Sequence, residues 1–179
     1  LHFYLKREYD TALTLYNRAL LESDNYTNLH PNLYKRIADV YNRKSQYDTA
    51  QSILRKGVKI AEQERQFHQM GRMYNSYGIS SRRMSRLDSS LYYYDLALKA
   101  YQQSEQTKEK TEDELIKDYA NIYKNKGIIY ATLSIDDLAL ENFLKAISME
   151  EKGNLKEQLA KSYLNIGVFY QGIKNFEKF

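Results

Sequence analysis

The chain has 179 residues, of which 42% are hydrophobic and 28% are charged, and its formal net charge is +4. This composition excludes a disordered tail, and no apolar run reaches the roughly 18 residues that a membrane-spanning helix needs. The absence of cysteine excludes disulfides and thiolate metal sites, and the scarcity of proline and glycine favours helices over a sheet with many turns.

The first predicted element lies within residues 1–28 and carries Ala12, Tyr16 and Ala19 at spacings of four and three. Such spacings place side chains on one face of a helix. We interpret this segment as the second half of a repeat unit. The opening residues show no basic start followed by an apolar run, so we expect no signal peptide in this sequence.

From residue 29 onward, the same alternation of small and large residues returns in pairs of predicted helices. The first helix of each pair carries a tyrosine, a small residue four positions later and, in most copies, another tyrosine three positions after that. The second helix carries a small, a large and a small residue at the same spacings. The first-helix sets are Tyr34/Ala38/Tyr41, Tyr74/Gly78/Ser81, Tyr123/Gly127/Tyr130 and Tyr163/Gly167/Tyr170, and the second-helix sets are Ala50/Leu54/Gly57, Ser90/Tyr94/Ala97 and Ala139/Phe143/Ala146.

Two further features bear on where helices begin and end. Three second helices follow a serine that stands three residues before an aspartate, at Ser45, Ser85 and Ser134. This arrangement is close to a capping box, so we expect these serines to cap the helices. The polar segment 99–118 consists of good helix formers, which predicts two long helices meeting near Thr107–Thr111, with a disordered linker as the alternative.

These columns resemble the tetratricopeptide repeat (TPR), whose pattern is W-x2-L-G-x2-Y…A-x3-F…P, with tyrosine here at the tryptophan position. The sequence departs from that pattern at Ser81, Lys126 and Phe179, and it lacks the terminal proline. The resemblance implies an all-α fold, a right-handed α-solenoid of antiparallel helix pairs. It implies a single array over 1–179, with a partial repeat at 1–28, repeats at 29–66, 67–111 (with long helices) and 112–153, and a partial repeat at 154–179.

Close helix packing explains why small and large residues alternate. We expect Gly127 and Ala139 to be small because the two helices of their pair approach each other there. Tyr123, Tyr130 and Phe143 then fill the space beside that contact, since protein interiors are closely packed.

In the resembled family the concave side of the array receives peptides or partner proteins. Carrying its groove columns over to this sequence gives a basic, amide-rich first half and an aliphatic stripe. We therefore expect a protein or peptide partner with acidic and apolar side chains, the alternative being that several of these residues only solvate the surface. The implied groove residues are Asn32, Lys35, Asp39, Asn42, Arg43, Arg72, Asn75, Ile79, Arg82, Arg83, Asn121, Lys124, Ile128, Thr132, Lys161, Leu164, Val168 and Gln171.

Residues suited to catalysis or metal binding do not cluster in the sequence. His2, His30 and His68 lie on different predicted elements, with no carboxylate at metal-ligand spacing. No glycine-rich phosphate loop or nucleophile motif occurs. We therefore predict no catalytic residue, no metal, no cofactor and no enzymatic activity.

The copies of about 40 residues and their tyrosine-rich first helices resemble TPR sensor regions of bacterial transcription regulators and sensor kinases. There a ligand would shift the curvature of the array and so bias an output domain. The alternatives are an assembly scaffold without signalling output and nucleic-acid binding through Arg72, Arg82, Arg83 and Arg86. Residues 1–90 hold 15 Lys/Arg against 9 Asp/Glu, but residues 91–179 hold 12 against 14, and this near balance disfavours nucleic acid.

Two expectations concern the setting of the chain. Exposed ends of such an array can pair between chains, which predicts homo-oligomers. We expect no membrane contact from this segment, and the sequence leaves cytoplasm and periplasm equally open as its compartment.

Overall fold

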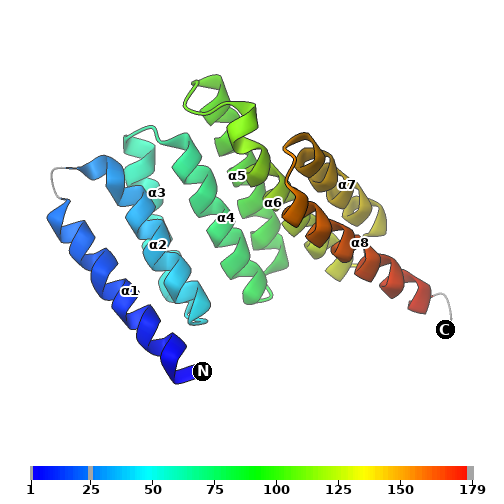
Figure 1. The fold of residues 1–179 in the computed structure, drawn as a ribbon, viewed down its shortest axis with the longest axis horizontal. Helices are drawn as coiled ribbons and strands as arrows, with labels where there is room; N and C mark the ends of the chain where they lie inside the picture. Colours follow the sequence, from blue (N-terminus) through cyan, green and yellow to red (C-terminus); the bar gives the residue numbers. More distant parts are fainter. Residues whose placement is uncertain (1, 24–25, 177–179) are drawn as a thin grey trace. The chain divides into compact units, whose positions relative to one another are not determined.

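The structure is a computed structural model that describes residues 2–23 and 26–176, and the side chains of 8–23 and 26–172. Within these residues it contains helices and no strand, which confirms the all-α fold class (Figure 1). The chain divides into two compact units, Leu1–Glu109 and Lys110–Phe179. The helices are α1 (His2–Glu22), the 3-10 helix η1 (Thr27–Leu29), α2 (His30–Arg43), α3 (Tyr47–Gln63), α4 (Phe67–Arg83), α5 (Leu87–Gln106), α6 (Glu112–Thr132), α7 (Asp136–Lys152) and α8 (Lys156–Phe176).

In the first unit each helix packs against the next one in sequence, from α1 to α5, and α2 also contacts α4. The apolar faces produced by the three- and four-residue spacings meet between these helices. One cluster joins Leu13 of α1 to Ile37 and Val40 of α2. A second cluster runs through α2, α3 and α4 and comprises Ala38, Ala50, Leu54, Ala61, Met73 and Tyr77.

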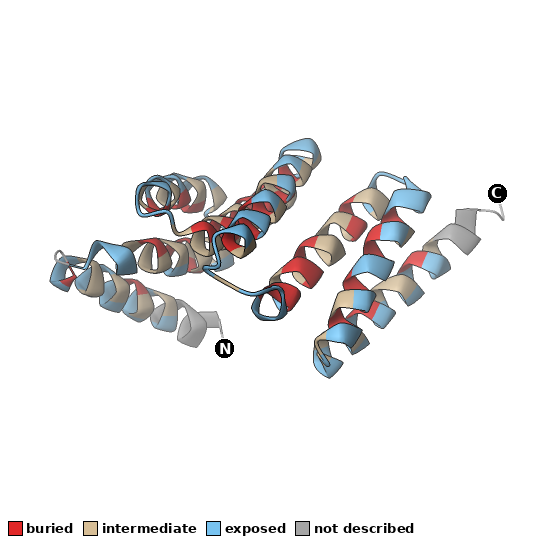
Figure 2. Ribbon diagram, turned by 90° about the horizontal axis from the view of Figure 1, so that it is seen from above, coloured by how far each residue is buried: buried red, intermediate tan, exposed pale blue. Residues whose placement is uncertain are grey.

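In the second unit α7 packs against both α6 and α8, and α6 also touches α8. Its core contains Ala139 and Phe143 of α7 and Phe169 of α8. Figure 2 shows the buried residues of the unit where the helices face one another, whereas the helix nearest the C-terminus is mostly exposed or half-buried. In this unit the residues at the predicted spacing on α7, Ala139, Phe143 and Ala146, are all buried.

The expected close approach at Gly127 is present, but the group opposite this glycine is the ring of Phe143 itself, which was expected beside the contact. A Cβ atom placed on Gly127 would lie 2.7 Å from Cδ1 of Phe143, so no side chain fits there. Gly78 of α4 is covered in the same way by the ring of Tyr94 of α5. Gly78 thus lets α4 and α5 approach closely, and Gly127 does the same for α6 and α7.

The predicted serine capping boxes are wrong. Gln46 and Arg86 occupy N-cap positions before α3 and α5, and neither makes a side-chain capping hydrogen bond. The serines that precede them, Ser45 and Ser85, instead adopt left-handed φ angles of 59° and 58°. Ser134, which precedes α7, adopts the same left-handed conformation, with a φ angle of 56°.

These left-handed residues end the preceding helix rather than start the next one. Ser45 N donates to the Asn42 carbonyl at 3.1 Å and Gln46 N donates to the Tyr41 carbonyl at 2.9 Å. Both hydrogen bonds satisfy carbonyl groups in the last turn of α2, as in a Schellman motif. The left-handed conformation recurs at Arg65, Lys108 and Asn154.

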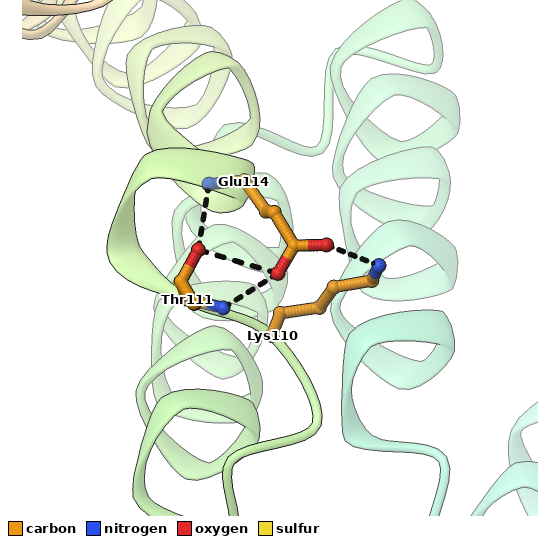
Figure 3. Close-up of polar contacts among 3 residues, drawn as sticks. All are labelled: Lys110, Thr111 and Glu114. Carbon is orange, nitrogen blue, oxygen red and sulfur yellow. Dashed lines mark hydrogen bonds and ion pairs between the residues drawn. The ribbon is translucent and has the colours of Figure 1, made fainter.

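The prediction of two long helices separated near Thr107–Thr111 is confirmed, because α5 ends at Gln106 and α6 begins at Glu112. A true capping box starts α6 (Figure 3). Glu114 N donates to Thr111 Oγ1 at 3.3 Å, and Thr111 N donates to Glu114 Oε2 at 2.8 Å. Lys110 Nζ donates to the other oxygen at 2.6 Å. The Lys110 hydrogen bond and that from the Thr111 backbone lower the pKa of Glu114 to about 2.

Candidate functional site

A cleft of about 860 Å³ opens in the second unit and is lined by α6, α7 and α8. This volume falls in the range of typical ligand pockets, roughly 300–1,000 Å³. One wall of the cleft is formed by the last turns of α6 and the turn that follows it. The opposite wall is formed by the face of α8 nearest to α6. Its lining residues are Ile128, Ala131, Thr132, Ser134, Asp136, Phe143, Leu164, Asn165, Val168, Phe169 and Gly172.

The lining is mainly apolar, and part of it lies open to solvent. Leu164 and Val168 of α8 are 66% and 60% exposed. Behind them lie the buried rings of Phe143 and Phe169, with centroids 5.8 Å apart and planes tilted by 60°. Exposed aliphatic side chains on a concave surface with an aromatic floor are typical of a binding site.

Few polar groups face this apolar surface. Thr132 Oγ1 already donates to the Ile128 carbonyl at 2.8 Å. Asn165 is half-buried and Asp136 is exposed at the first residue of α7. Among the described residues that line the cleft, Asp136 carries a formal charge and no lysine or arginine occurs. The cleft itself therefore suits apolar side chains accompanied by a cation, and the acidic side chains expected of a partner find no basic residue in this lining.

Of the groove residues predicted in the second unit, the structure brings Ile128, Leu164 and Val168 together in the cleft, along with Thr132. Lys124 and Lys161 lie outside the lining. Lys124 Nζ donates to Glu150 Oε1 of α7 at 3.2 Å, and Lys161 pairs with Glu157 one turn earlier on α8. Asn121, half-buried on α6, and Gln171, exposed on α8, are also outside the lining.

Sequence reasoning missed three residues of α8 that line the cleft. Asn165 follows Leu164 directly, Phe169 follows Val168, and Gly172 stands four residues after Val168. The four-residue spacing of Gly172 from Val168 marks the same helix face and was the available signal. The cleft extends across two adjacent rows of side chains along α8. Asn165 and Phe169 form the second row and therefore line the cleft as well.

In the first unit, three predicted groove residues on α2 form hydrogen bonds within the unit. Lys35 Nζ donates to Asp39 Oδ2 at 2.6 Å. The other carboxylate oxygen of Asp39 accepts from Ser76 Oγ of α4 at 3.0 Å. Asn42 Oδ1 accepts from Ser80 Oγ of α4 at 2.7 Å. These groups link α2 to α4, and this reduces what they can offer a ligand.

Three of the remaining predicted residues of the first unit are arginines in the last turns of helices. Arg43 closes α2, and Arg82 and Arg83 close α4. Cations at these positions stabilise the negative helix C-terminus. Arg43 and Arg83 are exposed and Arg82 is half-buried, as are Asn32, Arg72, Asn75 and Ile79.

The search for other kinds of site covers the described part of the chain. Within it, no three histidine, aspartate or glutamate side chains come together as a metal site would require. No helix in these residues combines the length and apolar character needed to cross a membrane.

The arrangement defines an all-helical, repeat-like protein. Among solved structures, the chain is similar to BtubC (BKLC) from P. vanneervenii, with a TM-score of 0.71 and 20% identity. The match covers 94% of this chain and 66% of that one, so the chain corresponds to just under two thirds of BtubC. At this identity the likeness shows the fold alone. No protein-family model matches the sequence, and neither does any curated protein.

Proposed function

We propose that this chain is a TPR-like binding module that receives a segment of a partner protein in the cleft between α6 and α8. The observation that carries the proposal is the exposure of Leu164 and Val168 on a concave surface backed by Phe143 and Phe169. In this proposal the helices form antiparallel pairs in a right-handed superhelix. The recurring small and large residues of the helix pairs support that arrangement.

The chemistry of the cleft defines the partner segment. An amphipathic helix or extended strand would place apolar side chains against Leu164 and Val168. A lysine or arginine of the partner would lie near the Asp136 carboxylate, and the Asn165 amide would serve partner backbone groups. The module works by binding and performs no reaction.

The wider role follows from the resemblance to bacterial sensor regions. We infer that the module is the interaction region of a signalling or transcription-regulatory protein, with an assembly scaffold as the alternative. A DNA-binding or kinase domain elsewhere in the full reading frame would favour the regulator, and its absence would favour the scaffold. Direct nucleic-acid binding is tested by retention on DNA at low salt.

The binding proposal can be tested with fluorescently labelled synthetic peptides and an anisotropy titration. We expect saturable binding of an amphipathic leucine–lysine peptide and weaker binding of its leucine–glutamate counterpart. Val168→Asp should weaken binding by at least about tenfold, because it places a charge in the apolar lining. Asp136→Asn should remove the preference for the lysine peptide.

The matched control is Leu144→Asp on α7, since Leu144 is 52% exposed and lies outside the cleft lining. This change should leave the affinity as it is. The absence of saturable binding by both peptides, or equal losses for Val168→Asp and Leu144→Asp, would overturn the proposal.

A further inference from the structure

The turn between α6 and α7 carries three exposed aliphatic side chains close together in the sequence. Leu133, Ile135 and Leu138 are 39%, 42% and 38% exposed. None of the three lines the cleft, but Ser134 and Asp136, which alternate with them along the chain, do line it. We call the three aliphatic side chains the turn patch, and the patch adjoins the cleft.

The exposure of Ile135 and Leu138 belongs to their positions in the helix pair. The residues at the same offsets from the left-handed serine of the turns before α3 and α5 are exposed as well, and they are Gln46, Thr49, Arg86 and Ser89. The first two of these stay exposed although α4 packs against α3. The exposure of the patch therefore does not depend on where the sequence ends.

The aliphatic character of the patch is not needed to build the turn. A hydrophobic contact often accompanies the residue at the position of Ile135, two residues beyond a helix end. Here Ile135 N donates to the Tyr130 carbonyl at 2.9 Å, but Gln46 N and Arg86 N make the same backbone hydrogen bond at 2.9 Å in their own turns. An amide or a guanidinium side chain thus serves equally well at this position, and the aliphatic residues of the α6–α7 turn require another explanation.

The backbone holds the patch in a fixed conformation. Leu133 N donates to the Ile129 carbonyl at 3.0 Å, and Ser134 N donates to the Ala131 carbonyl at 3.2 Å. Together with the Ile135 hydrogen bond, these contacts fix the turn to the end of α6. A partner that binds a surface ordered in advance loses less conformational entropy, which favours binding there.

The charges around the patch define the chemistry of its partner. Residues 127–144 contain three acidic residues and no lysine or arginine. Of the three, Glu141 already accepts a hydrogen bond from Lys145 Nζ at 2.6 Å. Asp136 and Asp137 are exposed at the first two positions of α7, where carboxylates also stabilise the helix. Exposed aliphatic groups beside these carboxylates suit a segment that combines apolar and basic side chains, whereas an anionic lipid surface would be repelled.

We propose that the partner segment continues from the cleft across the turn patch, with apolar side chains against Ile135 and Leu138 and a lysine or arginine beside Asp137. This inference rests on the proposed function, because the segment that continues is the one bound in the cleft. It assigns the partner a second apolar and basic stretch next to the one that the cleft receives. Since both stretches belong to one chain, the second contact adds to the affinity of the first.

Anisotropy titrations with peptides of two lengths test this inference. The short probe is the labelled leucine–lysine peptide that tests the cleft, and the long probes extend it by a second leucine–lysine stretch at either end. We expect one long probe to bind at least about tenfold more tightly than the short one. Ile135→Gln with Leu138→Thr installs the residues of the turn before α3. This double variant should reduce the long probe to the affinity of the short probe and leave the short probe unaffected.

Two further changes separate charge from general stickiness. Asp137 lies outside the cleft lining, so Asp137→Asn should reduce the gain of the long probe alone. The matched control is Gln46→Ile with Thr49→Leu, which places the same aliphatic side chains on the turn before α3. This control should not raise the affinity for either probe, and circular dichroism should show unchanged helix content in all variants.

The outcomes distinguish this inference from the proposed function. If the short probe binds but neither long probe binds more tightly, or if the gain survives in the double variant at Ile135 and Leu138, the extension across the turn is overturned and the cleft is not. Absence of saturable binding by every probe overturns both. Self-association in sedimentation velocity, or binding to phosphatidylcholine vesicles, that disappears in the double variant would assign the patch to a second copy or to a lipid surface and would also overturn the inference.

Discussion

The ring of Phe143 lies directly over Gly127, so closely that a Cβ on that glycine would be 2.7 Å from both Cδ1 and Cε1 of the ring. Phe143 is only 2% exposed and packs against Ala139 and Phe169. Because the ring is buried against these residues, a larger residue at position 127 would have to displace it from its packing. The distance between α6 and α7 therefore depends on the absence of a side chain on Gly127.

Replacing Gly127 with leucine should destabilise the protein by about 1–3 kcal/mol, because overpacking a close helix contact forces side chains out of their rotamers. Urea unfolding followed by circular dichroism would measure this change. The matched substitution is Gly167→Leu, at the same column of α8, where a Cβ meets no atom of the described residues within 4 Å.

Gly167→Leu should not reduce stability, because leucine has a higher helix propensity than glycine by up to about 1 kcal/mol. The comparison must be made at a concentration where the chain is monomeric. Equal losses from the two substitutions would show that helix packing does not depend on the small residue at Gly127.

Spacing along a single helix could be read from the sequence, and it predicted which residues share a helix face, such as Tyr123, Gly127 and Tyr130. The grouping of Ile128, Leu164 and Val168 in one groove came from the family resemblance. Spacing does not show which side chains on different helices contact each other. Ser76, for example, donates to Asp39, 37 residues earlier in the chain. The sequence shows that each residue is polar but not that the two side chains meet.

The helix starts show a second limit of the sequence. Ser45 and Thr111 both stand three residues before an acidic residue, yet Thr111 alone forms a capping box. The turn before α3 is so short that Ser45 adopts the left-handed conformation that ends α2. The connection before α6 is longer, so Lys108 takes the left-handed position and Thr111 is left to cap.

Left-handed backbone at Arg65 suggests a stabilising substitution. Its φ angle is 55°, a conformation that costs a residue with a Cβ about 1–2 kcal/mol. Glycine adopts it freely but loses about 0.5–1 kcal/mol more entropy on folding. Arg65→Gly should therefore raise stability by about 0.5–1 kcal/mol in a urea titration. The control is Glu62→Gly in the last turn of α3, which should lower stability.

The capping box gives stability a specific dependence on pH. Hydrogen bonds from Lys110 and from the Thr111 backbone lower the pKa of Glu114 from its ordinary 4.5 to about 2. A lowered pKa means that the carboxylate favours the folded state above pH 4.5, and that this contribution is lost as the pH falls toward 2. The chain should therefore be more stable than Glu114→Gln at pH 7, and the difference should close between pH 4.5 and 2.

Glutamine keeps much of the capping geometry without the charge, so the comparison isolates the ionised carboxylate. Side-chain NMR titration of Glu114 should give a pKa well below 4.5. A stability difference between the chain and Glu114→Gln that is the same at pH 7 and pH 2 would contradict the assignment.

Lys124 was predicted to line the binding groove, but in the structure it forms an ion pair with Glu150. Substitutions at this pair can show whether Lys124 serves stability or binding. Glu150 is fully buried, Lys124 is 15% exposed, and the Oε2 atom of Glu150 has no hydrogen-bond partner among the described residues. Lys124→Met should cost about 3–5 kcal/mol, because it leaves a buried carboxylate without its counter-charge. Urea unfolding of the monomer would measure the loss.

Replacing both members of the pair should recover most of that stability. The residues in the Glu150 column of the preceding second helices are Ala61 and Tyr101, which are buried, so the position accepts an apolar side chain. We expect Lys124→Met with Glu150→Leu to approach the stability of the unmodified chain, since well-packed apolar residues often replace a buried ion pair without loss. If instead Lys124→Met left stability unchanged but weakened peptide binding, Lys124 would belong to the binding surface that the sequence predicted.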